Sequence, residues 1–268
     1  MRTVLLSSTL LRHHYVANAV ADALDLVGVW QEEKSFVPHS YAANAEDREV
    51  IASHFAARDA SEELFFGGHR RLGLQSGARL RVGGPGIIND ADEIADMEAL
   101  DPHVVLVFGT GLLRAGIIER FAGRIINLHL GLSPYYRGAG TNFWPLVNRQ
   151  PEYVGATIHY LDAGIDTGPI VAHARPEMAL ADGPHEIGNK AIIAGADALI
   201  QVARAHGCGA IASVAQTVGG RLCQRKDFSA ASVRTLWRNF ETGMIGDYLA
   251  RRAERDAAVD LLPIPVGR

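Results

Sequence analysis

The sequence predicts a doubly wound α/β protein with a mixed sheet and a short C-terminal appendage. Over most of the chain, short apolar runs of strand length alternate with longer segments that have helical spacing. Two later apolar runs are separated by too few residues for a helical crossover, so we expect this pair of strands to be antiparallel. Parallel strands joined by helices, followed by one antiparallel pair, would form a mixed sheet.

The first half of the chain carries the regular alternation of strands and helices. The expected strands lie at 3–6, 26–30, 79–82, 104–108 and 125–130, and the expected helices at 15–24, 45–66, 90–100 and 112–121. Within the second helix, Val50, Ile51, His54 and Phe55 form a stripe that we expect to face inward. The order of these elements is typical of a sheet that has helices on both faces.

The second half of the chain adds two strands at 154–161 and 169–175, with the turn-rich segment 162–168 between them. A long helix is expected at 184–206. Beyond residue 207 the pattern becomes shorter, and a last amphipathic helix is expected from about 229 to about 256. We therefore divide the chain into a main domain, 1–206, and a small appendage, 207–268.

The composition is that of an ordinary globular protein. The chain has 268 residues, of which 48% are hydrophobic and 21% charged, with a formal net charge of −4. This charge disfavours nucleic acid as a partner, and no apolar run is long enough to span a membrane. The first apolar run suits a strand better than a signal peptide. The two cysteines, Cys208 and Cys223, form neither a disulfide framework nor a zinc knuckle, so we expect a cytoplasmic protein.

Two polar side chains share one face of the strand at 125–130. Successive residues of a strand point to opposite faces, so Ile126 and Leu128 lie on one side and Asn127 and His129 on the other. Ligands of α/β sheets gather beyond the carboxyl ends of the strands, where this pair lies. The alternative is a capping Asn beside a half-buried structural His.

A second polar segment can be brought to the same place. Thr157 and His159 share a strand face, and the turn after them contains Asp162 and Asp166. An Asp beside a His fixes its tautomer and stabilises its protonated form, and an Asn can donate to a developing oxyanion. Together they would form a site for acyl transfer without a nucleophilic Ser or Cys. For one of the two aspartates, we expect an ordinary Asx turn instead.

Other constellations fit the sequence less well. The segment FGTGLLRAG lacks dinucleotide-binding spacing, and no P-loop is present. A metal held by His129, His159, Asp166 and His173 would match no known ligand spacing. His13 and His14 are expected at the surface or at the start of a helix.

The two polar segments, NLHLGLSPYYRG and GATIHYLDAGIDTGPI, resemble the corresponding motifs of the folate-dependent formyltransferases. This family includes the glycinamide ribonucleotide, methionyl-tRNA and sugar N-formyltransferases. The resemblance is strongest over 104–170 and extends over 1–206. It implies a Rossmann-like catalytic domain that transfers a formyl group from 10-formyltetrahydrofolate to an amine.

The resemblance also implies roles for individual residues. Asn127 would polarise the formyl oxygen, His129 would act as acid, base or electrostatic stabiliser, and Asp166 would orient His129. His159 and Thr157 would support them from behind. The pterin ring of 10-formyltetrahydrofolate, the co-substrate, would lie against the residues Gly111, Leu112, Leu113, Leu161, Asp162 and Ala163.

The acceptor amine is expected to be chosen by the loop after the first motif. Its candidate contacts are Arg137, Tyr135, Asn142 and Trp144, of which Tyr135 and Trp144 could equally be loop packing. In this loop the segment GAGTNFWP differs from the purine and tRNA enzymes, and Gly131 stands where the family usually has Ser. The appendage also looks too short for the C-terminal domain of the tRNA enzyme.

These differences favour a small-molecule amine as acceptor, with a nucleotide-linked amino sugar as the leading candidate. We expect no metal at the site. Three alternatives remain at this point: a formyltetrahydrofolate hydrolase, an enzyme like methionyl-tRNA formyltransferase, and a folate-binding module without activity. A homodimer formed through the last helix is also compatible with the sequence.

Overall fold

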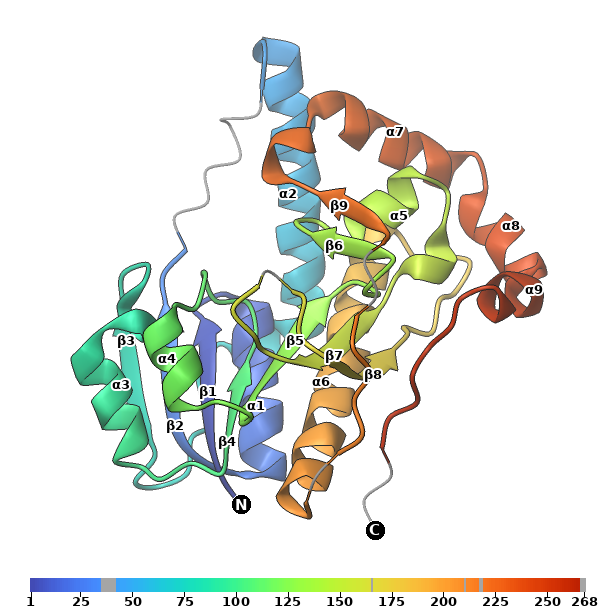
Figure 1. Ribbon diagram of the computed structural model, residues 1–268. Coiled ribbons are helices and arrows are strands. Elements are labelled where there is room, and N and C mark those ends of the chain that lie inside the picture. Colours follow the sequence, from blue (N-terminus) through green and yellow to red (C-terminus); the bar gives the residue numbers. More distant parts are fainter. Residues whose placement is uncertain (35–41, 165, 210, 217–218, 266–268) are drawn as a thin grey trace.

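The computed structural model of the chain describes residues 1–34, 42–164, 166–209, 211–216 and 219–265, and it is built around a seven-stranded sheet (Figure 1). The strand order is β3-β2-β1-β4-β5-β7-β8. The strands of this sheet are β1 (Arg2–Ser8), β2 (Asp25–Glu32), β3 (Arg79–Gly83), β4 (Val104–Val107), β5 (Ile125–Leu130), β7 (Ala156–Tyr160) and β8 (Ile170–Ala174).

The sheet is mixed, as expected. Strands β1 to β5 pair in parallel, whereas β7 is antiparallel to both β5 and β8. The segment between β7 and β8 is too short to hold a crossover helix, which explains the change of direction. The order of the chain reverses between β1 and β4, and ligands of open α/β sheets bind beyond the carboxyl ends of strands at such a reversal.

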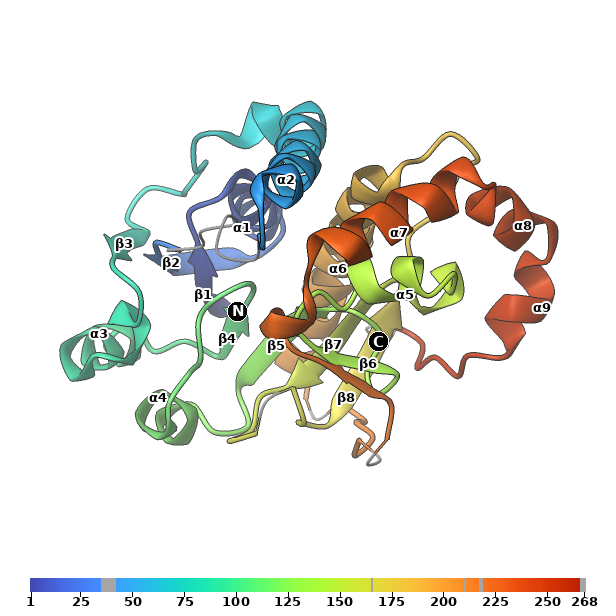
Figure 2. The same ribbon diagram turned by 90° about the horizontal axis from the view of Figure 1, so that it is seen from above.

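Helices cover both faces of the sheet (Figure 2). On one face lie α1 (Leu11–Ala23), α2 (Ala45–Phe66) and α6 (Pro184–Gly207), and on the other lie α3 (Ala91–Glu98) and α4 (Ala115–Arg120). Alternate residues of β1 serve the two faces: Leu5 joins the core under α1 and α6, while Val4 and Leu6 join the core under α3 and α4. The expected doubly wound architecture is therefore confirmed.

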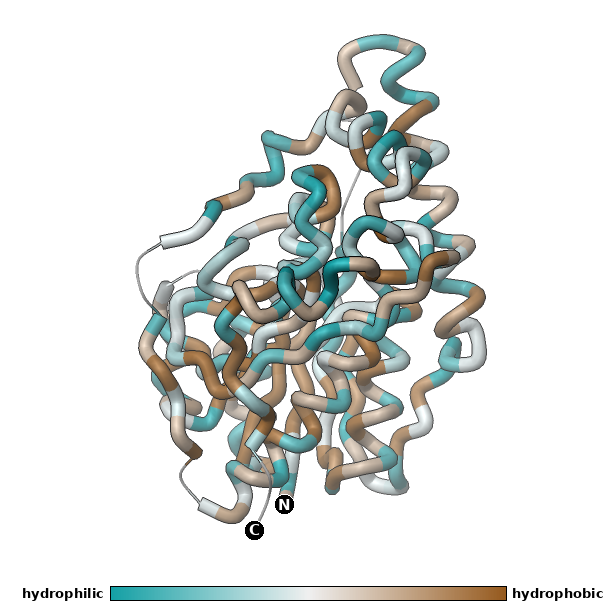
Figure 3. The backbone as a smooth tube through the Cα atoms, turned by 90° about the vertical axis from the view of Figure 1, so that its right-hand side faces the viewer, coloured by the Kyte–Doolittle hydropathy of each residue, from teal (hydrophilic) through white to brown (hydrophobic). Residues whose placement is uncertain are grey.

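The distribution of hydropathy follows these two cores. In Figure 3 hydrophobic segments gather in the central strands, while hydrophilic segments lie mainly in peripheral helices and loops. Each of the two cores contains fully buried side chains, such as Leu106 of β4 in the first and Ile117 of α4 in the second. Among the described residues, no helix is both long and apolar enough to cross a bilayer.

The C-terminal segment packs against the rest of the chain. Strand β9 (Arg221–Cys223) pairs with β6 (Tyr136–Gly138) in a second small sheet. Leu236 and Ile245 join Leu146 of α5 (Phe143–Val147) and Ile187 of α6 in a third buried cluster. Short 3-10 helices in the described part of the chain lie at Gly67–His69, Ile87–Asn89, Pro151–Tyr153 and Arg225–Asp227.

The single final helix expected over 229–256 is wrong. This region forms α7 (Ala230–Glu241), α8 (Met244–Ala250) and α9 (Arg252–Ala257). Gly243 has φ +80°, a left-handed conformation that cannot continue a right-handed helix, so α7 ends before it. The three helices wrap around α5, as Figure 1 shows, whereas one straight helix would extend away from α5.

Candidate active site

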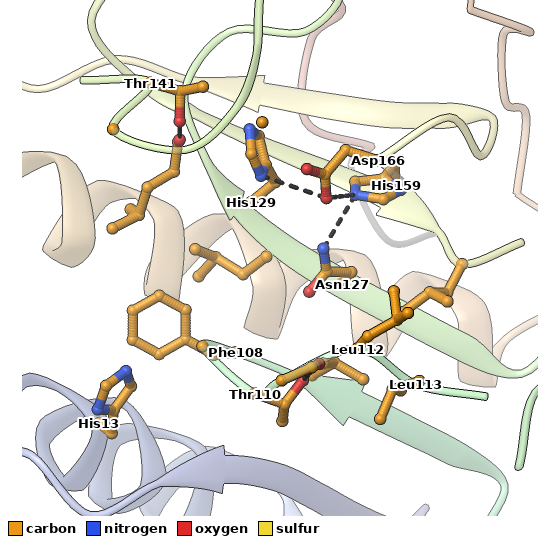
Figure 4. Close-up of a pocket in the computed structure, with 18 of the residues that line it drawn as sticks. His13, Phe108, Thr110, Leu112, Leu113, Asn127, His129, Thr141, His159 and Asp166 are labelled. Carbon is orange, nitrogen blue, oxygen red and sulfur yellow. Dashed lines mark hydrogen bonds and ion pairs between the residues drawn. The ribbon is translucent and has the colours of Figure 1, made fainter. Parts of the chain in front are cut away.

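The antiparallel pairing of β5 and β7 brings the two polar motifs together. Asn127 lies opposite His159, and His129 lies opposite Thr157. The pairing places all four side chains on the same face of the sheet, away from the core formed by Leu128 and Ile158. Figure 4 shows the side chains of Asn127, His129, His159 and Asp166 directed toward one another.

The carboxylate of Asp166 lies between two imidazoles. Its Oδ1 is 3.4 Å from Nδ1 of His129 and 3.9 Å from Nε2 of His159. The same Nε2 of His159 is 3.0 Å from Nδ2 of Asn127. His129 and Asp166 are 10% and 20% exposed, so water screens their interaction only weakly. The three residues predicted for catalysis therefore form one cluster.

The hydrogen bonds of His159 define the orientation of Asn127. Nδ1 of His159 lies 2.8 Å from the carbonyl oxygen of Tyr160, to which it can only donate. In a neutral ring Nε2 is then an acceptor, so the Asn127 amide donates one of its two N–H groups to it. The second N–H and the carbonyl oxygen of Asn127 stay available to a ligand.

Burial and charge shift the titration of two members of the cluster. Burial, with a smaller contribution from the nearby His129, lowers the pKa of His159 to about 4. Burial alone would raise the pKa of Asp166, but the hydrogen bond from His129 and the electrostatic effects of the two imidazoles and of Arg137 outweigh it, so the pKa lies below its ordinary value. At neutral pH the cluster holds a neutral His159 and an ionised Asp166.

The two aspartates of the turn have different surroundings. Oδ1 of Asp162 accepts from the amide N–H of Gly164 at 3.0 Å and from the Thr167 hydroxyl at 2.8 Å, which is an Asx turn. Asp166 faces the imidazoles and has φ +51°, an uncommon backbone conformation for a residue other than Gly. The Asx turn expected for one of the two is thus formed by Asp162.

A cleft of about 440 Å³ opens beside the cluster. On one side of Asn127 and His129 it is lined by the loop after β4 and by the turn after β7; on the other side it is lined by α1 and the loop after β5. Figure 4 shows these two arms, with Leu112 and Leu113 in the first and His13 and Thr141 in the second; Phe108, the first residue after β4, lies on the side of His13. The cleft contains Gly111, Leu112, Leu113, Leu161 and Asp162 of the predicted pterin contacts, whereas Ala163 is not among its described lining residues.

The predicted acceptor residues are divided between the cleft and the structure around it. Asn142 lines the cleft, and its amide both donates to and accepts from the backbone of Gly155. Trp144 lines an adjoining chamber. Tyr135 exchanges two hydrogen bonds with the backbone of Asp260, which fits loop packing. The guanidinium of Arg137 is near enough to lower the pKa of Asp166.

The loop after β5 is held by Thr157. Its hydroxyl donates to the carbonyl of Gly131 at 2.6 Å and accepts from the amide N–H of Ser133 at 2.9 Å. Gly131 has φ +132°, and a Cβ on it would collide with Thr141, whose hydroxyl donates to the carbonyl of Leu130. A glycine at this position therefore makes room for Thr141 beside His129.

Sequence reasoning missed two residues that shape the cleft. His13 lies at the start of α1, one of its two expected positions, but it is buried and lines the second arm, where its ring packs on Phe108 at 5.0 Å. Burial lowers its pKa well below the ordinary value, so it stays neutral. Glu32 accepts from the amide N–H groups of Gly86 and Gly111 and so holds the loop after β4. His13 follows β1 and Glu32 ends β2, close to the place where the strand order reverses. This position was the signal that could have identified both residues.

The metal alternative finds no support in the geometry. Both ring nitrogens of His173 have partners: Nε2 lies 2.8 Å from the carbonyl of Ser133, and Nδ1 accepts from the amide N–H of Leu262 at 2.9 Å. Within the described ranges, His, Cys, Asp and Glu side chains form no group of three arranged to hold a metal ion.

Comparison with known proteins points to one family. Residues 88–203 match the model of a family described as "Formyl transferase". A methionyl-tRNA formyltransferase from Synechococcus elongatus is 33% identical over 132 residues, which are 48% of this chain and 40% of that protein. One from Finegoldia magna is 31% identical over 119 residues, 44% of this chain and 38% of that protein. The chain thus spans about two fifths of the length of these curated relatives.

Solved structures share the fold. A phosphoribosylglycinamide formyltransferase from Anaplasma phagocytophilum superposes with a TM-score of 0.54 at 16% identity, over 84% of this chain and 98% of that one. A sugar N-formyltransferase from a Shewanella species gives 0.54 at 17% identity, over 85% and 78%. At such low identity these structures establish the architecture of the chain and no more.

Proposed function

Because the chain belongs, through residues 88–203, to the formyl transferase family, we propose that it is an N-formyltransferase. It moves a formyl group from 10-formyltetrahydrofolate to the amine of a small molecule, with a nucleotide-linked amino sugar as the leading candidate. The observation that carries this proposal is the convergence of Asn127, His129 and Asp166 from two separate motifs at one side of the cleft.

The cleft suits a folate on its first arm. The backbone of Gly111 to Leu113 and the turn at Leu161 and Asp162 line it there, and Glu32 fixes the first of these loops through the N–H of Gly111. A flat ring can lie against such a backbone surface and use its free polar groups. When bound, 10-formyltetrahydrofolate supplies the carbon to which the amine adds, and tetrahydrofolate leaves.

Each residue of the cluster has a separate role in the reaction. The free N–H of Asn127 donates to the oxygen that gains negative charge during the addition. His129 accepts the proton that the amine loses, and the ionised Asp166 at 3.4 Å stabilises the imidazolium. The proton then passes to the nitrogen that the formyl group leaves, so no proton is gained or lost overall. Neutral His159 holds Asn127 in place.

The first prediction concerns this cluster. His129→Ala and Asp166→Asn should each lower turnover by at least about 100-fold, the scale of a lost acid or base. The assay follows tetrahydrofolate release when enzyme, 10-formyltetrahydrofolate and a candidate amine are mixed. His103→Ala and Asp92→Asn, which change exposed residues that do not line the cleft, serve as matched controls and should keep full activity. Full activity in either cluster variant would refute the mechanism.

The same assay separates the alternatives. Release of tetrahydrofolate without any amine would identify a formyltetrahydrofolate hydrolase, which can use the same three residues. Tight folate binding without any turnover would identify a binding module. Methionyl-tRNA is the second candidate acceptor because the curated relatives are methionyl-tRNA formyltransferases; formylation of charged initiator tRNA tests it directly. We propose a cytoplasmic location and no stable nucleic-acid partner.

A further inference from the structure

His173 of β8 lies in line with two residues of the candidate active site. In the register of the sheet, His129 of β5 pairs with Thr157 of β7, and Thr157 pairs with His173. Residues directly opposite one another on neighbouring strands have their side chains on the same face of the sheet. His173 therefore lies on the face that carries the catalytic cluster, on the far side of β7 from His129.

The two outer residues of this row hold the first part of the loop after β5. The Thr157 hydroxyl bonds to the carbonyl of Gly131 and to the amide N–H of Ser133. Nε2 of His173 lies 2.8 Å from the carbonyl oxygen of Ser133, to which it can only donate. Because Ser133 is fully buried, both of its backbone groups need partners inside the protein, and Thr157 and His173 supply them.

The other ring nitrogen of His173 is held by the segment 259–264. Nδ1 accepts from the amide N–H of Leu262 at 2.9 Å, and the backbone N–H of His173 donates to the carbonyl of Leu262 at 2.9 Å. Burial lowers the pKa of the His173 ring below its ordinary value, so the ring is neutral at neutral pH. Since Nδ1 faces a donor, the ring proton stays on Nε2, where it bonds to Ser133.

The segment 259–264 also holds the loop after β5 directly. The Tyr135 hydroxyl accepts from the amide N–H of Asp260 at 2.9 Å and lies 3.2 Å from the carbonyl oxygen of the same residue. Val259 is buried and Ile264 packs against the first core, so the segment is fixed at both ends. Figure 1 shows the chain after α9 running down beside β8. The loop is thus held at two neighbouring points, one through His173 and one directly.

The later residues of the same loop form one wall of the cleft. This loop wall consists of Gly138, Gly140, Thr141, Asn142 and Phe143. Thr141 donates to the carbonyl of Leu130, so the end of the loop is tied to its beginning. A displacement of the first residues of the loop would therefore move the wall beside His129. Neither His173 nor Tyr135 is among the described residues that line the cleft, so both act on the wall from outside it.

We infer that His173 is a positioning residue for the loop wall, and that the segment 259–264 keeps it in the tautomer that donates to Ser133. This inference rests on the proposed function for the identity of the reaction. It adds that the C-terminal part of the chain sets the shape of the second arm, where we expect the acceptor amine. The loop after β4, on the folate arm, is held separately by Glu32.

Two substitutions of His173 separate its two side-chain hydrogen bonds. The side-chain amide of Gln reaches the place of Nε2, and that of Asn reaches the place of Nδ1. His173→Gln should therefore keep the bond to Ser133, whereas His173→Asn should keep only the bond to Leu262. Tyr135→Phe removes the direct bonds to Asp260 but keeps the ring. Asp260→Ala is its matched control, because those bonds use only the backbone of Asp260.

Hydrogen exchange followed by mass spectrometry is the first measurement, because it needs no ligand. The amides of residues 131–142 should exchange at least about 10-fold faster in His173→Asn and Tyr135→Phe, the scale of one lost bond to a buried group. They should stay close to wild type in His173→Gln and Asp260→Ala, and the amides of residues 109–113 should not change in any variant. Equal acceleration by both His173 variants, or none by either, would overturn the inference.

Kinetics then test the consequence for the reaction. With the amine that supports the fastest tetrahydrofolate release in the assay above, the KM for that amine should rise at least about 10-fold in His173→Asn, because the loop wall is misplaced. His173→Gln should restore most of the loss. The affinity for tetrahydrofolate should not change, which also shows that the variants are folded. Should His173→Asn fail to fold, Tyr135→Phe, a smaller change at a half-buried residue, decides the same question. An unchanged KM in folded variants would overturn the positioning role.

The two readouts keep this inference separate from the proposed function. If exchange responds as expected but no amine stimulates tetrahydrofolate release, the hold of the segment 259–264 on the loop stands and the proposed function fails. If an amine is formylated and its KM is the same in every variant, the proposed function stands and the inference fails.

Discussion

At the scale of single residues, the alternation of β5 was predictable and the choice between the two aspartates was not. The side-chain period of a strand is a local property, so the sequence alone placed Asn127 and His129 on one face. The positions of Asp162 and Asp166 depend on how the turn is folded, and that depends on residues far along the chain. The side chain of Gln216 donates to the carbonyl oxygens of both Asp166 and Gly168, at 2.9 and 2.7 Å.

The second prediction concerns these two hydrogen bonds from Gln216. Removing them in Gln216→Ala should leave the uncommon backbone conformation of Asp166 unsupported. Turnover should then fall by about 10-fold, while the affinity for tetrahydrofolate changes little. Steady-state rates, with kcat and KM measured separately, test the expectation. Gln75→Ala, at an exposed Gln whose side chain also donates to a backbone carbonyl, is the control. If Gln216→Ala behaves like this control, Gln216 does not position Asp166.

The pair Gly131 and Thr141 shows a second limit of sequence reasoning. The sequence revealed that Gly131 replaces the Ser usual in the family, but not what compensates for the change. In the structure Thr141 occupies the space that a side chain at 131 would need. The two residues lie on either side of β6, and their contact becomes visible only when this segment is folded.

At the scale of elements, the strands and long helices were predicted well and the C-terminal helices poorly. The boundaries expected for α2 and β5 agree with the structure, because an apolar period over many residues specifies them. The amphipathic pattern over 229–256 also persists, since Leu236, Ile245 and Tyr248 are all buried. The pattern does not reveal that Gly243 interrupts the helix. The apolar residues before and after Gly243 would lie on the same face of one continuous helix.

The third prediction follows from the conformation of Gly243. A Cβ at this position meets nothing within 4 Å, so Gly243→Ala should destabilise the chain by about 1 kcal/mol through the left-handed φ alone. Gly188, inside α6, also has open space around a Cβ but a helical backbone. Gly188→Ala should therefore stabilise the chain by about 0.5 kcal/mol or more. Urea unfolding measures both, and equal effects would contradict the assignment.

At the scale of the whole molecule, the doubly wound sheet was predictable and the packing of the C-terminal part was not. The sheet order follows from local alternation and the handedness of crossovers. The C-terminal segment instead makes contacts with distant partners: Val214 pairs with Ile170 at the edge of the sheet, Leu262 bonds to His173, and Arg234 bonds to Asp47 of α2. The division into 1–206 and 207–268 stays a prediction, and the shared third core makes the two parts dependent on each other.

Several histidines are buried in neutral form, and together they make the stability of the fold depend on pH. Burial lowers the pKa of His54 to about 3 and of His159 and His185 to about 4. In the unfolded chain the same groups titrate near about 6.5. Between these values the unfolded state binds more protons than the folded state, so the stability that is fully present above about pH 6.5 is lost as the pH falls toward 4.

The fourth prediction is the slope of this loss. Near pH 5 each such His should contribute about 1.4 kcal/mol per pH unit to the free energy of unfolding. His54→Phe removes one titrating group from an aromatic cluster that can accept the new ring, so its slope should be smaller by about that amount. Urea unfolding between pH 7.5 and 5 measures the slope, with the exposed His103→Ala as control. A slope in His54→Phe equal to that of the wild type would mean that His54 is protonated in the fold, and the aromatic cluster around it would then carry a charge.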